Sequence, residues 1–401
     1  MNIATYYPWV YLTSGVERTI VEMCRRSRHT FTVFTNHYEP ENTYPEFGGI
    51  RVVQLPYIPV RRQLAPVLMA ALTIASHKLP IQGFDALLVH CDGLGNLALN
   101  RVDEIPAICM CHTPLRPVYD PHYRERALSR LNGPSRLAFN VFSAAFASVD
   151  RHMFRRYRYV VFNSSETLMR AKRGGLLELI DDRYAVVHPG VDWHSYQPSW
   201  RYDRYFLVAG RIMWTKNIEM GIDAFIQFKA ITEANRDFRL VIAGRVDKKS
   251  DVYIERLRMM AAGRADIDFV VSPSDEILQH LYANCYGLVF PAFNEDWGMV
   301  PLEANAFGKA VIATDLGGPT ESQTDGETGF LVACDSSSFA SAMTRLAADP
   351  SLAREMGARA RTGCRQYDWS NFVDSMDSLL DAAVVPIAGG VHAPPRAQES
   401  A

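Results

Sequence analysis

Short apolar runs alternate with longer stretches of helical period along most of the chain, and this alternation constrains the fold more than any other feature. Such runs are typical of strands buried on both faces, and the stretches between them of helices that cover a parallel sheet. Strands are expected in the first half at Ile3–Tyr6, Phe31–Phe34, Ile50–Val53, Ala86–Val89, Ala107–Cys111 and Tyr159–Phe162. Helices are expected near Val16–Arg26, Gln63–Ser76 and Arg124–Phe154. The first half therefore predicts an α/β domain.

The pattern starts again after residues 188–199, whose prolines and glycine interrupt both periodicities. The second set of expected strands is Tyr205–Ala209, Arg239–Ala243, Ile267–Val271, Gly287–Phe290 and Ala310–Ala313. We expect two Rossmann-like, doubly wound α/β domains, residues 1–195 and 196–366, that face each other across a cleft. Residues 367–385 predict a C-terminal helix, and residues 386–401, rich in Ala, Gly and Pro, a disordered tail.

Charge is unevenly distributed, although the net charge is only -2. Up to residue 174 the chain has 21 Lys and Arg against 13 Asp and Glu, and beyond it 21 against 31, so the parts carry +8 and -10. Most of the positive excess lies in residues 121–174, with 11 basic and 3 acidic side chains. This region would suit an anionic surface, either nucleic acid or the cytoplasmic face of a membrane, and equally a solvated helix face.

Residues 61–80 leave two interpretations open, a core helix and a helix on a membrane surface. The seven cysteines are scattered without metal-ligand spacing, which argues against a disulfide framework and against a zinc site. The first residues have neither a basic leader nor a long apolar core, and no apolar run is long enough to span a bilayer. We therefore expect a cytoplasmic protein.

Two carboxylates, Glu295 and Glu303, flank Gly298 in a segment that predicts a strand, a turn and a helix beginning near Met299. Gly298 and the amides of Met299 and Val300 would then lie at a positive helix end, free to approach a phosphate or a sugar hydroxyl. A diphosphate repels carboxylates, so we expect the two glutamates to accept hydrogen bonds from sugar hydroxyls. On its own, this spacing is more typical of a surface turn followed by an exposed helix face.

Two cations follow the expected strand Tyr205–Ala209: Arg211 directly after Gly210, and Lys216 at the start of the next helix. A guanidinium and an ammonium at the carboxyl end of a parallel strand suit a diphosphate leaving group, whose developing charge they would stabilise. Together with the two glutamates they predict one pocket.

These segments resemble the large family of retaining GT-B glycosyltransferases of the group 1 type. The matching segments occur in family order over nearly the whole chain: 111–120, Gly210-Arg211 with Lys216, 243–245, 274–278, 295–303, 317–321 and 325–329. Residues 111–120, which hold His112, Arg116 and Asp120, are most similar to bacterial mannosyltransferases of O-antigen and exopolysaccharide assembly. In this family the C-terminal helix, here residues 367–385, crosses back to the N-terminal domain.

The resemblance implies a role for each candidate in the second domain. Arg211 and Lys216 would hold the donor diphosphate, and Glu303 would receive the ribose hydroxyls. Glu295, with the amides of Gly298, Met299 and Val300, would hold the transferred sugar. Val271 and Ser272 stand where the family often has a glycine loop beside the base, which leaves the base contacts open.

The resemblance also assigns roles in the first domain. His112 would approach the transferred sugar, so the implied catalytic residues are His112, Arg211, Lys216 and Glu295. Gly15 would let the backbone come close to the diphosphate, although Ser14 stands where the family often has a second glycine. Arg116 and Asp120 would bind the acceptor.

The implied reaction is a retaining transfer of a hexose, with mannose expected, from a nucleoside diphosphate sugar such as GDP-mannose to a glycan or lipid-linked glycan in polysaccharide assembly. No metal or other cofactor is expected, because Arg211 and Lys216 take the place of a cation. Residues 121–174 would attach the protein peripherally to the inner face of the cytoplasmic membrane, and no nucleic-acid partner is expected.

Two competing functions and one candidate metal motif remain at this point. A GT-B-fold sugar-nucleotide epimerase would act without an acceptor, and a non-catalytic sugar-nucleotide-binding protein would not act at all. Asp266 and Asp268 match the Asp-x-Asp metal signature of another transferase fold, but they precede or lie in an expected strand rather than following one. We therefore expect no metal at these two carboxylates.

Overall fold

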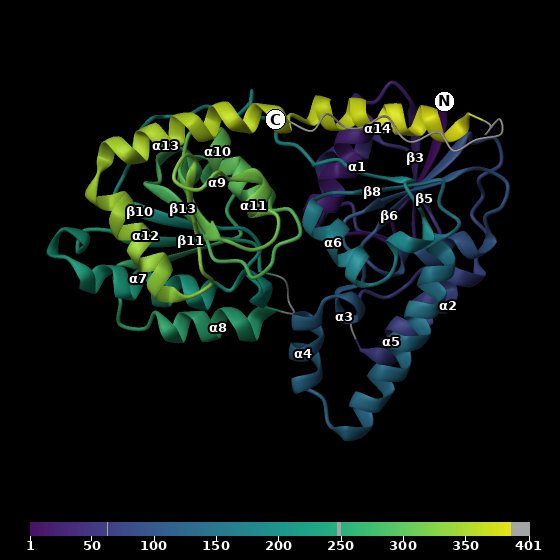
Figure 1. Ribbon diagram of the computed structural model, residues 1–401, viewed down its shortest axis with the longest axis horizontal. Coiled ribbons are helices and arrows are strands. Elements are labelled where there is room, and N and C mark those ends of the chain that lie inside the picture. Colours follow the sequence, from purple (N-terminus) through teal and green to yellow (C-terminus); the bar gives the residue numbers. More distant parts are fainter. Residues whose placement is uncertain (62, 247–249, 386–401) are drawn as a thin grey trace. The chain divides into compact units, whose positions relative to one another are not determined.

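The structure is a computed structural model that describes residues 1–61, 63–246 and 250–385 and divides into two compact units (Figure 1). The first unit comprises Met1–Pro189 with the described residues from Ser370 onward, and the second comprises Gly190–Trp369. The division falls a few residues from the boundary expected after residue 195. The expected tail, 386–401, lies outside the described residues.

Seven parallel strands form the main sheet of the first unit, in the order β5-β3-β1-β6-β7-β8-β9. Their bounds are β1 Asn2–Tyr6, β3 Thr30–Thr35, β5 Val52–Gln54, β6 Ala86–Cys91, β7 Ala107–Cys111, β8 Tyr159–Phe162 and β9 Tyr184–Val186. Every strand expected in this half forms; β7 and β8 have the expected bounds, and the ends of the others are shifted. The short β9 and a separate parallel pair, β2 (Trp9–Val10) and β4 (His37–Tyr38), were not expected.

The helices expected in the first unit form at their expected positions, with one exception. The helices of this unit are α1 Gly15–Arg26, α2 Leu64–Ser76, α3 Arg116–Tyr119, α4 Pro121–Ser129, α5 Gly133–Phe154, α6 Ser165–Arg173 and α14 Trp369–Val384, with 3-10 turns at Pro45–Gly49, Leu94–Arg101 and Leu177–Leu179. The single helix expected over Arg124–Phe154 is wrong, because α4 ends at Ser129 and α5 begins anew. Asn132 caps α5, and Pro134 in its first turn lacks the N–H that a continuous helix would use.

The C-terminal helix α14 packs against the end of α1 in the first unit (Figure 1). The Ser27 hydroxyl and the Arg28 N–H both donate to Asp377, the latter over 3.0 Å. The Arg28 guanidinium pairs with Asp381. Side-chain pairs of this kind fix the helix on the unit from which it is far separated in sequence.

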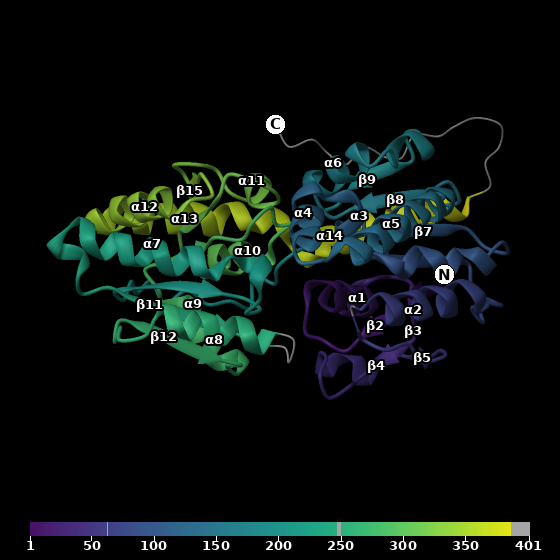
Figure 2. The same cartoon turned by 90° about the horizontal axis from the view of Figure 1, so that it is seen from below.

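The second unit contains six parallel strands in the order β12-β11-β10-β13-β14-β15. Their bounds are β10 Tyr205–Ala209, β11 Arg239–Gly244, β12 Ile267–Val271, β13 Gly287–Phe290, β14 Val311–Thr314 and β15 Gly329–Val332. All the strands expected here form, and β15 was not expected. Alternate residues of β10 enter different clusters: Phe206 and Val208 pack with α7 and α12, Leu207 and Ala209 with α9 and α10. Figure 1 shows α9 above and α7 below the strands of this sheet, and Figure 2 shows the paired strands β11 and β12 side by side.

The helices of the second unit connect these parallel strands or follow the last of them. They are α7 Ile218–Ile231, α8 Asp251–Met260, α9 Asp275–Asn284, α10 Met299–Ala306, α11 Pro319–Ser322, α12 Ser336–Ala348 and α13 Pro350–Gly363, with 3-10 turns at Trp214–Lys216, Glu233–Asn235 and Cys364–Tyr367. The helix expected to begin near Met299 does begin there. Since both faces of the sheet are buried, its strands are nearly continuous apolar runs.

Each sheet has one point where the chain turns from one side to the other. In the first unit β1 pairs with β3 on one side and β6 on the other. In the second unit β10 pairs with β11 on one side and β13 on the other. Ligands of doubly wound sheets bind outside the carboxyl ends of the strands at such a switch point. The segments that follow β10 and β13 are therefore expected to line a site.

Candidate functional site

An ion pair joins the two segments at the switch point of the second unit. Lys216, which ends the 3-10 turn after β10, donates from Nζ to Oε2 of Glu295 over 2.7 Å. Their side chains are 16% and 20% exposed, so the pair is reachable from solvent but largely shielded. The Lys216 Nζ also lies 5.3 Å from the centroid of the Phe290 ring at the end of β13. An ammonium has three protons and a carboxylate several acceptor positions, so each partner can also bind a ligand.

The loop that carries Glu295 is held by two adjacent glycines. Glu295 forms a parallel bridge with Gly317, and the Gly318 N–H donates to the Glu295 carbonyl over 2.9 Å. A β-carbon on Gly317 would lie 2.3 Å from that carbonyl oxygen, and one on Gly318 would lie 2.1 Å from the carbonyl oxygen of Trp297. No other residue type allows this approach, so the segment 317–318 fixes where the Glu295 backbone lies.

Gly298 caps α10 with φ of 94°, a conformation that side-chain-bearing residues rarely adopt. The helix begins at Met299, so its first N–H groups, including that of Val300, have no partner within the helix. These groups and the helix dipole make the start of α10 attractive to negative charge.

Arg211 comes immediately after β10 and is half-buried. A β-carbon on its neighbour Gly210 would lie 3.4 Å from Cγ2 of Val300, which places the end of β10 against the first turn of α10. Among the described residues Arg211 has no hydrogen bond or ion pair. The structure thus brings the chain at Arg211, the ion pair of Lys216 with Glu295 and the start of α10 together at one switch point.

Glu303 lies on α10, one turn beyond Met299, and is half-buried. Its Oε2 accepts a hydrogen bond of 2.7 Å from the hydroxyl of Tyr282, a residue in the last turn of α9. Burial, and then the nearby Glu303, raise the pKa of Tyr282 well above its usual value, so the hydroxyl stays protonated and donates.

Val271 and Ser272 lie at the end of β12, which is an edge strand separated from β10 by β11. The Ser272 N–H donates to the carbonyl of Gly244 over 2.9 Å, and Ser272 has φ of 50°. Both residues therefore end their strand at the same sheet edge as Arg211, two strands away.

His112 follows β7 in the first unit and is 6% exposed. Its ring stacks on that of His90 with centroids 5.3 Å apart and planes 16° apart. A hydrogen bond of 3.0 Å joins Nε2 of His112 to Nδ1 of His90. Burial, and then the neighbouring His112, hold the pKa of His90 well below its usual value, so His90 is neutral.

Arg116 and Asp120 pair with each other in the first unit, with side chains that are 16% and 2% exposed. Arg116 donates from Nε and Nη2 to one oxygen of Asp120 over 3.1 and 2.9 Å, and the other oxygen caps α4 at the Tyr123 N–H. Arg170, 1% exposed, lies 3.7 Å from the same carboxylate and donates to Thr113. Burial acts to raise the pKa of Asp120, but Arg116, the Tyr123 N–H and Arg170 hold it below its usual value.

Gly15 is the first residue of α1, at the carboxyl edge of the first sheet. The neighbouring Ser14 hydroxyl donates to Glu17, and the Leu12 N–H donates to the other oxygen of that carboxylate over 3.2 Å. Glu17 therefore closes the turn that precedes α1 and holds Gly15 in place.

Several residues that support these candidates were not predicted from the sequence. Tyr282 supports Glu303, His90 supports His112, and Gly317 with Gly318 supports Glu295. The two glycines lie in segment 317–321, which resembles the family, but no neighbouring residue in the sequence indicated that they contact Glu295. The two aromatic partners lie about 20 residues from the side chains they contact, so no short motif could have revealed them.

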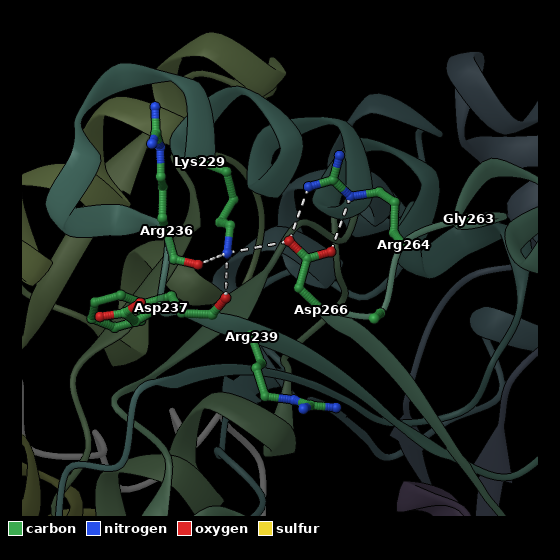
Figure 3. A pocket seen from close by; sticks show the side chains of 9 residues that line it. Lys229, Arg236, Asp237, Arg239, Gly263, Arg264 and Asp266 are labelled. Carbon is green, nitrogen blue, oxygen red and sulfur yellow. Dashed lines mark hydrogen bonds and ion pairs between the residues drawn. The ribbon is translucent and has the colours of Figure 1, made fainter.

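A surface hollow of about 560 Å³ lies at the opposite, amino edge of the second sheet. Figure 3 shows Lys229 and Arg264 converging on Asp266 there, while Arg236 and Arg239 point away from it. Asp268 pairs with Arg239 over 2.9 Å. Both carboxylates of the Asp-x-Asp segment are thus neutralised by cations of the chain, which leaves them poorly suited to a metal.

The two halves of the chain match two family profiles. Residues 198–363 match the profile described as glycosyl transferases group 1, and residues 13–194 match that of glycosyltransferase family 4. The two matches follow each other along the chain and correspond closely to the two units. The chain belongs to the group 1 glycosyltransferases.

Curated relatives of this group 1 glycosyltransferase carry the names of different transferases. A D-inositol 3-phosphate glycosyltransferase from Acidothermus cellulolyticus is 32% identical over 212 residues, 49% of this chain and 47% of that protein. The alpha-1,3/1,6-mannosyltransferase ALG2 of Dictyostelium discoideum is 26% identical over 190 residues, 44% of this chain and 45% of that protein. The chain spans about half the length of the curated relatives it matches.

A solved structure confirms the fold of this group 1 glycosyltransferase over nearly its full length. HepE from Anabaena, in complex with UDP and glucose, has a TM-score of 0.72 at 16% identity and covers 95% of this chain and 100% of its own. The GT-B fold that the sequence predicts is therefore confirmed.

Proposed function

We propose that the protein is a retaining glycosyltransferase that moves a hexose from a nucleoside diphosphate sugar to a glycan or a lipid-linked glycan in polysaccharide assembly. Family membership supports the reaction class. The observation that carries the proposal furthest is the ion pair of Lys216 with Glu295, which joins the segments after β10 and β13 at the switch point.

The donor diphosphate suits the positive groups at this point. Arg211 offers a planar set of donors, Lys216 keeps protons beyond the one given to Glu295, and the start of α10 adds backbone N–H groups. Glu295 then accepts from hydroxyls of the transferred sugar, and Glu303 from the ribose. The negative charge on these two residues is separated from the diphosphate by the sugar rings they bind.

Anomeric retention follows from a displacement on one face of the donor sugar. The bond from C1 to the leaving phosphate oxygen breaks, the acceptor oxygen bonds to C1 from the same side, and the acceptor's proton passes to that phosphate oxygen. Arg211 and Lys216 stabilise the charge that develops on the diphosphate, which is worth a few kcal/mol of barrier lowering.

Roles in the first unit rest on the resemblance. His112 contacts the transferred sugar, Gly15 lets backbone N–H groups approach the diphosphate, and Arg116 with Asp120 binds the acceptor. Of these, His112 has the clearest structural support, because His90 fixes its ring orientation.

The decisive experiment is a donor panel analysed by NMR. GDP-mannose is the first donor, since ALG2 is a mannosyltransferase, and UDP-glucose the second, since HepE was solved with UDP and glucose. Each is incubated with and without a lipid-linked glycan acceptor. We expect an acceptor-dependent product with the donor's anomeric configuration. An epimerised sugar without acceptor would indicate an epimerase, and a bound, unchanged donor would indicate a binding protein.

Metal independence belongs to the same proposal, because two side-chain cations face the diphosphate. Activity should persist in excess EDTA and gain little from added magnesium or manganese. Loss of activity in EDTA that either metal restores would refute this part of the proposal.

We also propose peripheral attachment to an anionic membrane through residues 121–174, with the protein on the cytoplasmic side. On α5, Leu137 and Val141 lie one turn apart and are 66% and 62% exposed, within the most basic part of the chain. No helix in the described part of the chain is long and apolar enough to cross a bilayer. Anionic vesicles at low salt should bind the native protein and bind Leu137→Ser/Val141→Ser more weakly; equal binding would refute the contact.

A further inference from the structure

Tyr282 forms a hydrogen bond with Glu303 that has no role in the reaction proposed above. The hydroxyl donates to Oε2 of Glu303 over 2.7 Å, and the tyrosine is only 3% exposed. The two residues belong to α9 and α10, which pack on the same face of the second sheet. Tyr282 therefore contacts Glu303 from the interior of the unit.

The ring of Tyr282 is fixed by its aromatic neighbours. Phe307 stacks on it with centroids 5.7 Å apart and planes 5° apart. Phe307 also stacks with Tyr196, at 4.8 Å and 18°. A ring held this way cannot swing, so the hydroxyl presents its proton to Glu303 from one fixed direction.

We propose that Tyr282 is a positioning residue that orients the Glu303 carboxylate toward the ribose of the donor and makes the site select ribonucleoside over 2′-deoxyribonucleoside diphosphates. This inference rests on the proposed function, in which Glu303 receives the ribose hydroxyls. It adds which residue sets that contact and which feature of the nucleotide is discriminated.

The preference for ribonucleotides follows from the hydrogen bond to Glu303 that a 2′-deoxynucleotide cannot make. A glutamate side chain has three rotatable bonds, and tying one of its oxygens fixes the direction of its remaining acceptor positions. A ribonucleotide can fill these positions with its 2′- and 3′-hydroxyls, whereas a 2′-deoxynucleotide leaves one acceptor without a donor. The penalty is large only if the carboxylate cannot turn away to find water. Without the tyrosine hydroxyl, Glu303 turns more freely and the penalty falls.

The test compares Tyr282→Phe with a matched control, Tyr205→Phe. The Tyr205 hydroxyl donates over 2.7 Å to the carbonyl of Leu281, the residue before Tyr282 on α9. The control therefore removes a tyrosine hydroxyl that donates to the backbone of the same helix, α9, without touching Glu303. Melting temperatures of both variants report the purely structural cost.

Affinities are measured by calorimetry for ADP, GDP and UDP and for their 2′-deoxy forms. The native protein should prefer the ribonucleotide of whichever base it binds. In Tyr282→Phe, affinity for that ribonucleotide should fall about tenfold while affinity for the deoxy form changes less than about twofold, so the preference shrinks. Tyr205→Phe should keep the native preference.

Other outcomes overturn the inference in distinguishable ways. If the native protein discriminates but Tyr282→Phe keeps the full preference, or loses both affinities by the same factor, then Tyr282 is structural and the proposed function stands. If the native protein binds ribo and deoxy forms equally, Glu303 does not read the 2′-hydroxyl. If none of the nucleotides binds, the proposed function fails together with the inference.

Discussion

The two sheets share one architecture, but the ion pairs at the carboxyl ends of their strands differ in burial and in partners. At the second sheet, Lys216 and Glu295 form a partly exposed pair at the switch point. At the first, Arg116 and Asp120 join the fully buried Arg170 in a network that also caps a helix. The cation is equally exposed in the two pairs, at 16% for Lys216 and for Arg116, so the difference lies in the carboxylate. Glu295 is 20% exposed, whereas Asp120 is 2% exposed and is held by the fold.

The largest expected effect concerns catalysis at the second sheet. Lys216→Ala should lower kcat/KM about 100- to 1000-fold, because the donor diphosphate loses one of its charge partners in the transition state. Lys229→Ala is the matched control, since Lys229 is also a shielded lysine of this unit, 13% exposed and 3.2 Å from Asp266, but at the opposite edge. The control should keep its activity. Equal losses in steady-state kinetics of the two variants would contradict the assignment.

The next effect concerns stability in the first unit. Arg170→Met should lower the free energy of unfolding by about 3 kcal/mol, because it leaves the buried Asp120 with one guanidinium partner fewer. Arg173→Met removes a neighbouring arginine whose side chain is 55% exposed, and should cost less than about 0.5 kcal/mol. Urea denaturation measures both. If the buried and the exposed arginine cost the same, the network is not structural and the contrast between the sheets disappears.

A third prediction concerns pH and a second buried network of the first unit. Asp150 accepts from Asn96 over 2.6 Å and from Tyr119 over 2.9 Å, and burial raises its pKa to about 7. The pKa of Asp150 in the folded protein lies above the unfolded value of 3.8, so the folded state holds its proton more tightly. This contribution to stability is complete below about pH 4 and is lost as the pH rises to 7. The free energy of unfolding therefore falls by about 2 kcal/mol between pH 5 and 7.

Asp150→Asn removes this titration and so tests its sign. Its free energy of unfolding should fall less between pH 5 and 7 than that of the native protein, as measured by urea denaturation at each pH. A native stability that rises over this range relative to the variant would show that the pKa of Asp150 is lowered rather than raised.

The smallest effect concerns the backbone before α10. Gly298→Ala should cost about 1 to 2 kcal/mol, because the residue has φ of 94° while a β-carbon would meet only ordinary contacts, the nearest at 3.5 Å. Gly363→Ala, at a helical glycine of the same unit with open space around it, should be neutral or stabilising. Thermal melts separate the two. A neutral Gly298→Ala would show that the turn before α10 tolerates other conformations.

The fold could be predicted from the sequence because its strands are buried on both faces. Runs such as Tyr205–Ala209 have no polar face, so they can be recognised as strands without knowing which strands they pair with. The short edge strands β9 and β15 lack that signal. The break between α4 and α5 was missed because the stretch is helical on both sides, although Gly133-Pro134 marked it.

The candidate site could be predicted only for charged residues that come soon after a strand in the sequence. Lys216 and Glu295 are 79 residues apart, yet each follows a strand at the switch point, so their proximity follows from topology. The contact of Arg170 with Asp120 depends instead on how a helix packs, and no local pattern indicates it. The resemblance therefore assigned Arg116 and Asp120 to the acceptor, and it did not indicate that they pair with each other.

The most direct test of the central claim is a crystal structure of the protein with the nucleoside diphosphate that binds best in the calorimetric panel. The account predicts phosphate oxygens within hydrogen-bond distance of Lys216 Nζ and the Arg211 guanidinium, with the ribose hydroxyls on Glu303. A nucleotide bound with its diphosphate elsewhere, for example beside Arg236 and Arg239 at the opposite edge of the sheet, would contradict it.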